Sequence, residues 1–259
     1  MKLRIAICAS VLVFSALPGR ADDPWESDPE EDGPATRAHI LAGQTQTGRD
    51  LQGGPAVPDE DWIWIATQAR HSYAATATGA SLWSHTTIVA AKLERIDSGL
   101  TVVGTGSDDE LAGFRGHSVR WIAASSEMEY LRVSGPPATN QPAAAYALEF
   151  LDTTYAIPRW NNSASQATIL LIQNNKPVAV TGSIYFYATN GTLLQTAPLS
   201  VPANGLQALN TGTLPALAGQ SGSAHVAHTG GRGALSGKAV SLEPATGFTF
   251  DTAMTPVLP

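Results

Sequence analysis

Short runs in which apolar and polar residues alternate dominate this chain, and helical periodicity is almost absent. Residues 59–65 read Asp-Glu-Asp-Trp-Ile-Trp-Ile, and residues 130–135 and 145–150 show the same period of two. This period is typical of β-strands, because successive side chains of a strand point to opposite faces of a sheet. Gly, Pro, Asn and Asp separate the runs. The pattern therefore predicts an all-β protein of sandwich type.

The alternation also predicts where the strands lie. Expected strands in the first half span residues 39–41, 62–67, 72–78, 86–93, 100–103, 118–123, 130–134 and 145–151. Expected strands in the second half span residues 167–173, 178–188, 193–200, 207–209, 223–228 and 234–243. Asn190-Gly191 is the strongest turn signal in the chain and predicts a hairpin with a type I′ turn.

These strands suggest two consecutive β-sandwich domains. We expect the first, of jelly-roll type, at residues 37–155 and the second at residues 156–259, with the connection near residues 155–159. Six or seven short strands in about one hundred residues are typical of an immunoglobulin-like sandwich, which is our prediction for the second domain.

The N-terminus has the pattern of a secretory signal. Lys2 and Arg4 precede an apolar stretch at residues 5–17, and small residues at positions 19 and 21 suit a signal peptidase. We expect residues 1–21 to be removed and the protein to be secreted, periplasmic or on the cell surface. The alternative is an uncleaved anchor, although the apolar stretch is short for a membrane span. Since Cys8 is the only cysteine, the mature chain excludes disulfides and thiolate chemistry.

The charge distribution narrows the range of partners. The formal net charge is −7, and acidic residues crowd the entry segment at residues 22–36. The chain carries no basic stripe, which argues against a nucleic-acid partner. It has no second apolar run of membrane length, so we expect no transmembrane segment after signal cleavage.

The order of several short motifs resembles the bacterial pre-peptidase C-terminal (PPC-like) family. The motifs are Gly-Gln-Thr-Gln-Thr-Gly at residues 43–48, Asp-Glu-Asp-Trp at 59–62, Ser-Asp-Asp at 107–109, Tyr-Leu-Arg-Val-Ser-Gly at 130–135 and Tyr-Ala-Leu at 146–148. The resemblance implies a β-sandwich accessory module with no catalytic role. The second half is similar in pattern to bacterial immunoglobulin-like modules, on residues 158–162, 174–175, 202–205 and 219–223.

Calcium is the candidate cofactor, and the resemblance implies a site at the acidic entry segment. Hard cations need several oxygen ligands, which loops of secreted sandwiches often supply. The candidate ligands are Glu30, Asp32, Asp59, Asp61, Asp108 and Asp109. The alternative is that these residues form turns or are solvated charges.

Aromatic side chains are the candidate ligand contacts. If Ile63 and Ile65 face the core, Trp62 and Trp64 share the opposite face of their strand. The alternative is that both tryptophans pack beneath a loop or against the second domain. The candidates for contact with a ligand are Trp64, Trp83 and Tyr185.

No catalytic constellation is evident in the sequence. The Gly-Gln-Ser-Gly-Ser stretch at residues 219–223 lacks the order of a nucleophile elbow and a following helix. His225 and His228 are three residues apart on an expected strand, so they point to opposite faces and do not share a metal ion. We predict a secreted, non-catalytic accessory or adhesion-type protein that binds a surface polymer or a protein. The alternatives are a structural spacer or assembly subunit of the cell envelope, and a secreted hydrolase with an unrecognised site.

Overall fold

The computed structural model describes residues 33–51, 60–79, 92–108, 116–135, 144–163 and 165–257. These residues form antiparallel β-sheets and two short 3₁₀ turns, and they include no α-helix. Within these ranges no helix is long and apolar enough to cross a membrane. The all-β class predicted from the alternating pattern is therefore confirmed.

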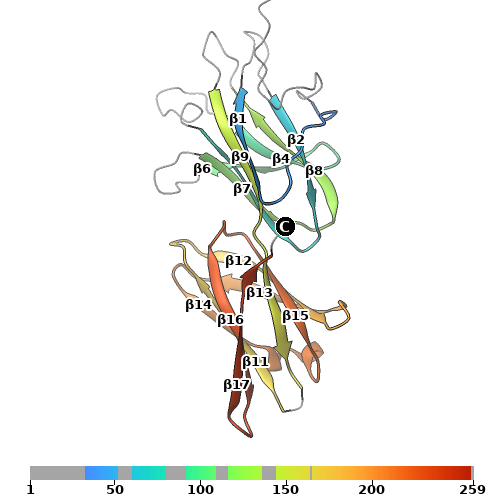
Figure 1. Ribbon diagram of the computed structural model, residues 1–259, viewed down its shortest axis with the longest axis vertical. Coiled ribbons are helices and arrows are strands. Elements are labelled where there is room, and N and C mark those ends of the chain that lie inside the picture. The colour runs from blue at the N-terminus through green and yellow to red at the C-terminus, as the bar shows by residue number, and fades with distance from the viewer. Residues whose placement is uncertain are drawn as a thin grey trace, which may run out of the picture.

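The strands before residue 153 form two sheets that enclose one hydrophobic core, and we call this part the first unit (Figure 1). One sheet has the order β1-β9-β3-β7-β6 and the other the order β2-β8-β4-β5. Ile63, Leu131 and Phe150 are among the side chains fully buried between them. The strands are β1 (Gln44–Leu51), β2 (Glu60–Thr67), β3 (Ser72–Thr78), β4 (Lys92–Ile96), β5 (Val102–Thr105), β6 (Ser107–Asp108), β7 (Gly116–Ile122), β8 (Glu127–Ser134) and β9 (Ala144–Asp152).

The strands from residue 155 onward form two further sheets around a second core, and we call this part the second unit. The sheet orders are β13-β12-β15-β10-β18 and β14-β11-β16-β17. Trp160 lies fully buried in this core, edge-on to Phe186 at 5.7 Å, and its indole N–H donates to the carbonyl of Ser223. The elements are β10 (Tyr155–Asn161), β11 (Ala167–Asn174), β12 (Val180–Ala188), β13 (Leu193–Val201), β14 (Leu206–Asn210), η1 (Thr211–Thr213), η2 (Pro215–Leu217), β15 (Ser221–His228), β16 (Leu235–Glu243), β17 (Phe248–Ala253) and β18 (Thr255–Pro256).

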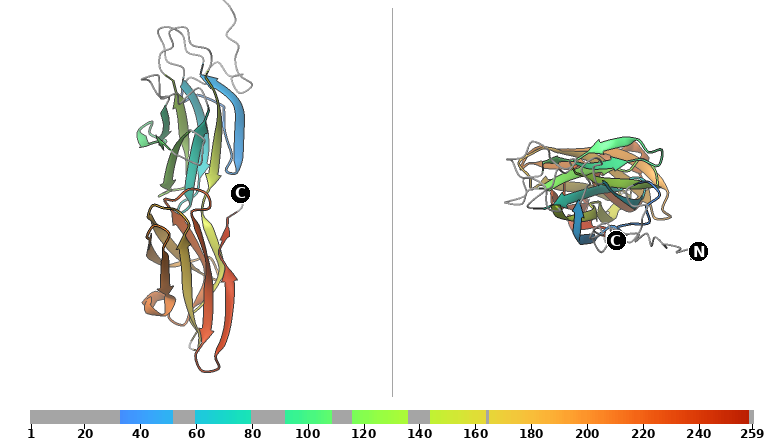
Figure 2. Two further views of the ribbon diagram at one scale, coloured as in Figure 1. Left: turned by 90° about the vertical axis from the view of Figure 1, so that its left-hand side faces the viewer. Right: turned by 90° about the horizontal axis from the view of Figure 1, so that it is seen from above.

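The two units lie end to end along the long axis of the molecule (Figures 1 and 2). The chain passes from β9 to β10 at their boundary, and the C-terminal segment returns to the same place. There Tyr155 of β10 is paired with Pro256 of β18. The division into two domains that fold independently stays a prediction.

Most expected strands are present within one to three residues of their predicted ends. The strand expected at residues 72–78 is β3 itself. The connection expected at residues 155–159 is wrong, because these residues belong to β10, which pairs with β15. The strand expected at 39–41 is also wrong, since an isolated bridge between His39 and Trp64 stands in its place. The expected strand at 86–93 lies largely outside the described residues.

The strands β1 and β17 are among those that the sequence pattern did not predict, and neither shows an alternation of buried apolar residues. β1 places the polar side chains of Gln46 and Arg49 in the interior, so its buried positions show no apolar alternation. β17 is exposed along most of its length and has no buried face to mark it.

The hairpin predicted around Asn190-Gly191 is present between β12 and β13, but its turn type is not the predicted one. A type I′ turn needs positive φ at both central residues. Gly191 has φ of 83°, whereas Asn190 is not among the residues with positive φ. The Gly191 N–H donates to the carbonyl of Ala188, and the loop has three residues. This is a tight turn followed by a left-handed glycine, which lets the strands keep their twist.

Candidate binding site

Strand β2 has the two faces expected from its alternation. Ile63 and Ile65 are fully buried in the first core. Trp62 and Trp64 share the opposite face, where Trp62 is 7% exposed and Trp64 is half-buried. The prediction that the two tryptophans lie opposite the core isoleucines is therefore confirmed.

Trp62 is covered by neighbours on its own face of the sheet. Its ring packs edge-on against Tyr130 at 5.8 Å, and its indole N–H donates to Glu60 at 3.0 Å. The guanidinium of Arg132 lies 5.2 Å from its ring centroid and pairs with Glu94 at 2.6 Å. This cross-strand cluster depends on the register of β2, β8 and β4, so the sequence gives no local signal for it.

Trp64 is covered instead by the segment that precedes β1. The backbone of this segment runs along β2, with the Trp64 N–H donating to Ala38 and the Ile40 N–H donating to Trp64. The pairing stacks the exposed imidazole of His39 on the Trp64 ring, with centroids 4.7 Å apart and planes 20° apart. The result is an aromatic pair at the surface of the first unit.

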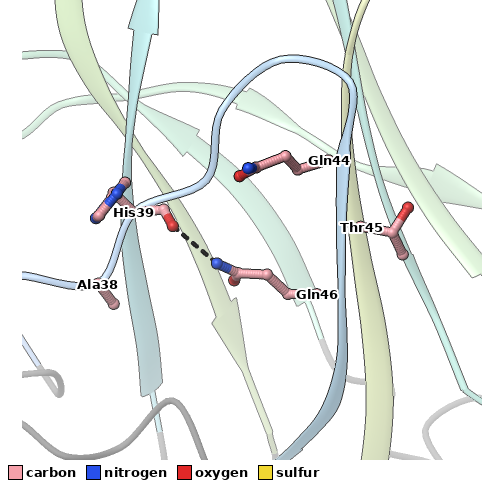
Figure 3. Close-up of a pocket in the computed structure, with 5 residues that line it drawn as sticks. All are labelled: Ala38, His39, Gln44, Thr45 and Gln46. Atoms are coloured by element: carbon pink, nitrogen blue, oxygen red, sulfur yellow. Dashed lines mark hydrogen bonds between the residues drawn. The ribbon is translucent and has the colours of Figure 1, made fainter.

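A hollow of about 430 Å³ lies beside this pair (Figure 3). It is lined by Ala38, His39, Gln44, Thr45 and Gln46. The amide of Gln46 donates to the carbonyl of His39 at 2.7 Å, which ties β1 to the segment that carries the imidazole. The described residues of the lining offer amide and hydroxyl groups and an imidazole, and they include no carboxylate, lysine or arginine.

A buried polar network supports the hollow from within. The Arg49 guanidinium donates to Gln46 at 2.9 Å and lies 3.9 Å from the carboxylate of Asp61. Asp61 also accepts a hydrogen bond from the hydroxyl of Tyr146. Burial, followed by the charge of Asp61, raises the pKa of Tyr146 well above its usual value, so this hydroxyl remains a donor. The network fixes Gln46 and, through it, the position of His39.

The candidate calcium ligands are not brought together within the part of the chain that the structure describes. Asp61 lies inside the first unit, 1% exposed, with Arg49 and Tyr146 as partners. Asp108 ends β6, where its backbone pairs with His117. The described residues contain no group of three or more His, Cys, Asp or Glu side chains that could hold a metal ion. The remaining candidates lie outside the described residues: Glu30, Asp32, Asp59 and Asp109.

The other aromatic candidates occupy different places. Trp83 lies outside the described residues. Tyr185 is half-buried on β12, opposite Thr196 of β13 and His225 of β15. Tyr187 is on the same face and packs edge-on against His225 at 5.2 Å. The second unit therefore presents a smaller aromatic surface on the outer face of its five-stranded sheet.

The histidines of β15 behave as their spacing predicts. His225 is half-buried on the outer face, while His228 is fully buried and donates from Nε2 to the carbonyl of Thr153 at 2.9 Å. Burial lowers the pKa of His228 to about 4, so its imidazole is neutral near neutral pH. Ser221 begins a strand rather than the turn into a helix that a nucleophile elbow requires.

Comparison with known proteins adds no family assignment. No protein-family model matches the chain, and a search of curated proteins finds no similar sequence. The similarity to the PPC-like and immunoglobulin-like families therefore stays a prediction from the motifs.

Proposed function

We propose that this chain is a secreted, non-catalytic binding protein whose first unit holds a polymer of the cell surface or its surroundings. The observation that carries the proposal is the exposed His39 imidazole stacked on Trp64 at the edge of an uncharged hollow. Aromatic side chains often contribute a large share of the binding free energy at a contact with a ligand, because they bury a large area at a small cost in conformational entropy.

The chemistry of the hollow favours an uncharged ligand rich in hydroxyl or amide groups. Gln44 and Thr45 supply exposed polar groups on one side, and the imidazole of His39 supplies a flat ring on the other. A strongly charged ligand would find no ion-pair partner among the five described lining residues. Polysaccharides have this neutral, hydroxyl-rich character, and an extended peptide backbone of a protein partner is the second class that fits.

The remaining predictions are compatible with this role. The signal sequence expected at residues 1–21 supports a location outside the cytoplasm, and the resemblance to PPC-like modules favours an accessory role. Calcium bound by the acidic entry segment would order the loops of the first unit. None of these features calls for a catalytic step.

A spacer of the cell envelope is the alternative that one observation favours. Thr153 and Thr154 connect the two units, and both are buried and hydrogen-bonded. Such a connection holds two modules in a constant relative orientation. However, the spacer hypothesis predicts Trp64 at the contact between domains, whereas Trp64 packs on His39 within the first unit.

The experiment is a binding assay of the full chain with insoluble cellulose, chitin and peptidoglycan sacculi as probes. We expect retention on at least one polymer, with a tenfold or greater loss in Trp64→Ala and a smaller loss in His39→Ala. Phe248→Ala is the matched control, since Phe248 is a 58% exposed aromatic on β17 of the second unit. Equal retention of all three variants would refute the assignment of the site, and no retention of the wild type would favour the spacer.

A further inference from the structure

The connection between the two units is short and tightly held. Thr153 and Thr154 are the residues between β9 and β10, and both are buried. The N–H of Thr153 donates to the carbonyl of Ser72 at 2.8 Å, and the N–H of Ser72 donates to the hydroxyl of Thr154 at 2.8 Å. On the other side, the N–H of Val257 donates to the carbonyl of Thr154. Motion between the units therefore has to break contacts at this boundary.

Two histidines from different units meet beside this connection. His71 precedes β3 in the first unit, and His225 lies on β15 in the second. Their ring centroids are 5.5 Å apart and their planes are nearly perpendicular. The Nδ1–H of His71 donates to the carboxylate of Asp152 at 2.6 Å, which holds the ring in place. Tyr187 of β12 also packs against His225, with ring centroids 5.2 Å apart.

A proton on His225 is unfavourable in this arrangement. Burial lowers the pKa of His225, and the adjacent His71 lowers it further, while the more distant carboxylate of Asp152 opposes both effects. The imidazole has Nδ1 buried without a hydrogen-bond partner, so no acceptor compensates an added proton there. The contact between the two units is therefore more stable with a neutral His225 than with a protonated His225.

The other charged and titratable groups at the boundary come from each element packed there. Among the described residues, and apart from His71, Asp152 and Tyr187, they include Tyr73 on β3, Arg120 on β7, Tyr155 on β10, His228 on β15 and the exposed pair Arg232–Glu149. Arg120 adds positive charge near His228, and burial of His228 also disfavours its protonation. The acidic groups are Asp152, which is engaged with His71, and Glu149, which lies 3.8 Å from Arg232.

We propose that the contact between the two units is a proton-sensitive latch, closed while His225 is neutral and released when His225 is protonated. A positive imidazole in the closed arrangement is half-buried beside His71, and separation of the units exposes it fully to solvent. Because the open form binds the proton more tightly, acidification shifts the population toward it. Near pH 5 an ordinary solvent-exposed histidine is almost fully protonated, so the shift develops between pH 7 and pH 5.

Small-angle X-ray scattering of the full chain tests this inference, with far-UV circular dichroism recorded on the same samples. We expect the radius of gyration to rise reversibly from pH 7.5 to pH 5.0 while the β-sheet spectrum is unchanged. His225→Gln, which cannot take the proton, should abolish most of the rise. His39→Gln is the matched control, because it also removes one imidazole but lies at the hollow of the first unit, and it should behave as the wild type.

A second variant keeps the test decisive if His225→Gln does not fold. His71→Gln removes the neighbouring imidazole, so the closed form tolerates a proton on His225 better and the rise should move to lower pH. A constant radius of gyration in the wild type would overturn the proposal. An equal rise in His225→Gln, or a rise that coincides with loss of the β-sheet spectrum, would overturn it as well.

Discussion

The buried ion pair between Arg49 and Asp61 makes a quantitative prediction about stability. The two side chains are 2% and 1% exposed, and their charged atoms are 3.9 Å apart. At an effective dielectric constant of about 20, two unit charges at that distance attract by about 4 kcal/mol. Asp61→Asn preserves the shape of the side chain and its acceptor for Tyr146, but it removes the negative charge that lies 3.9 Å from the buried Arg49 guanidinium. We expect a loss of about 3–5 kcal/mol in the free energy of unfolding.

A double-mutant cycle separates this attraction from other effects of the substitutions. The cycle uses Asp61→Asn, Arg49→Met and the double variant, measured by urea unfolding at pH 7 with chelator present. Arg49→Met keeps the apolar stem and removes the charge. Since the double variant removes both charges of this pair, it should be destabilised by about 2–4 kcal/mol less than the sum of the single variants.

An exposed ion pair provides the control for this cycle. Lys238 and Asp251 lie 2.8 Å apart, but their side chains are 48% and 58% exposed. Pairs of this kind often contribute nothing measurable, because water screens them and their long side chains lose entropy. A coupling between Arg49 and Asp61 no larger than that of the exposed pair would refute the reasoning.

Three further predictions concern protonation, a second buried pair and calcium. His228→Gln retains an N–H donor for Thr153 but cannot be protonated. Burial lowers the pKa of His228 to about 4 in the folded protein, against about 6.5 when unfolded. The unfolded state therefore binds more protons, and the free energy of unfolding decreases as the pH falls through this window. Between pH 7.5 and pH 5.0 the wild type should lose about 2 kcal/mol more than His228→Gln in urea titrations, and equal losses would contradict this. Glu129→Gln should lower the free energy of unfolding by about 3 kcal/mol in the same assay, because Glu129 is fully buried and pairs with Arg95. A decrease below about 1 kcal/mol would show that the pair is not formed. Millimolar calcium should raise the thermal midpoint of the wild type but not of Asp59→Ala, and the absence of any shift in the wild type would exclude the calcium site.

The sequence predicted one residue of the candidate site, Trp64, but not its partner His39 or the neighbouring hollow. The face on which Trp64 lies follows from the alternation along β2, so the sequence was sufficient to propose it as a contact. Its partner His39 comes from a segment that is paired with β2 in parallel, and the neighbouring hollow is formed by β1. The polar sequence of β1 contains no periodic apolar signal, because two of its buried side chains, Gln46 and Arg49, are polar. They are held by a hydrogen bond to each other and by the ion pair of Arg49 with Asp61, instead of by apolar contacts.

The sequence alone determined the class of the protein and most of its strands. Alternation with a period of two and the Gly, Pro and Asn turns are local properties of the sequence, and most strands show them without reference to any tertiary contact. The sequence also predicted that His225 and His228 lie on opposite faces of their strand, since residues three apart on a strand point to opposite sides. Only the tertiary structure decided that residues 155–159 form a strand and that His71 meets His225 at the boundary between the units. Those features depend on register and on contacts between residues far apart in the chain, which no local pattern encodes.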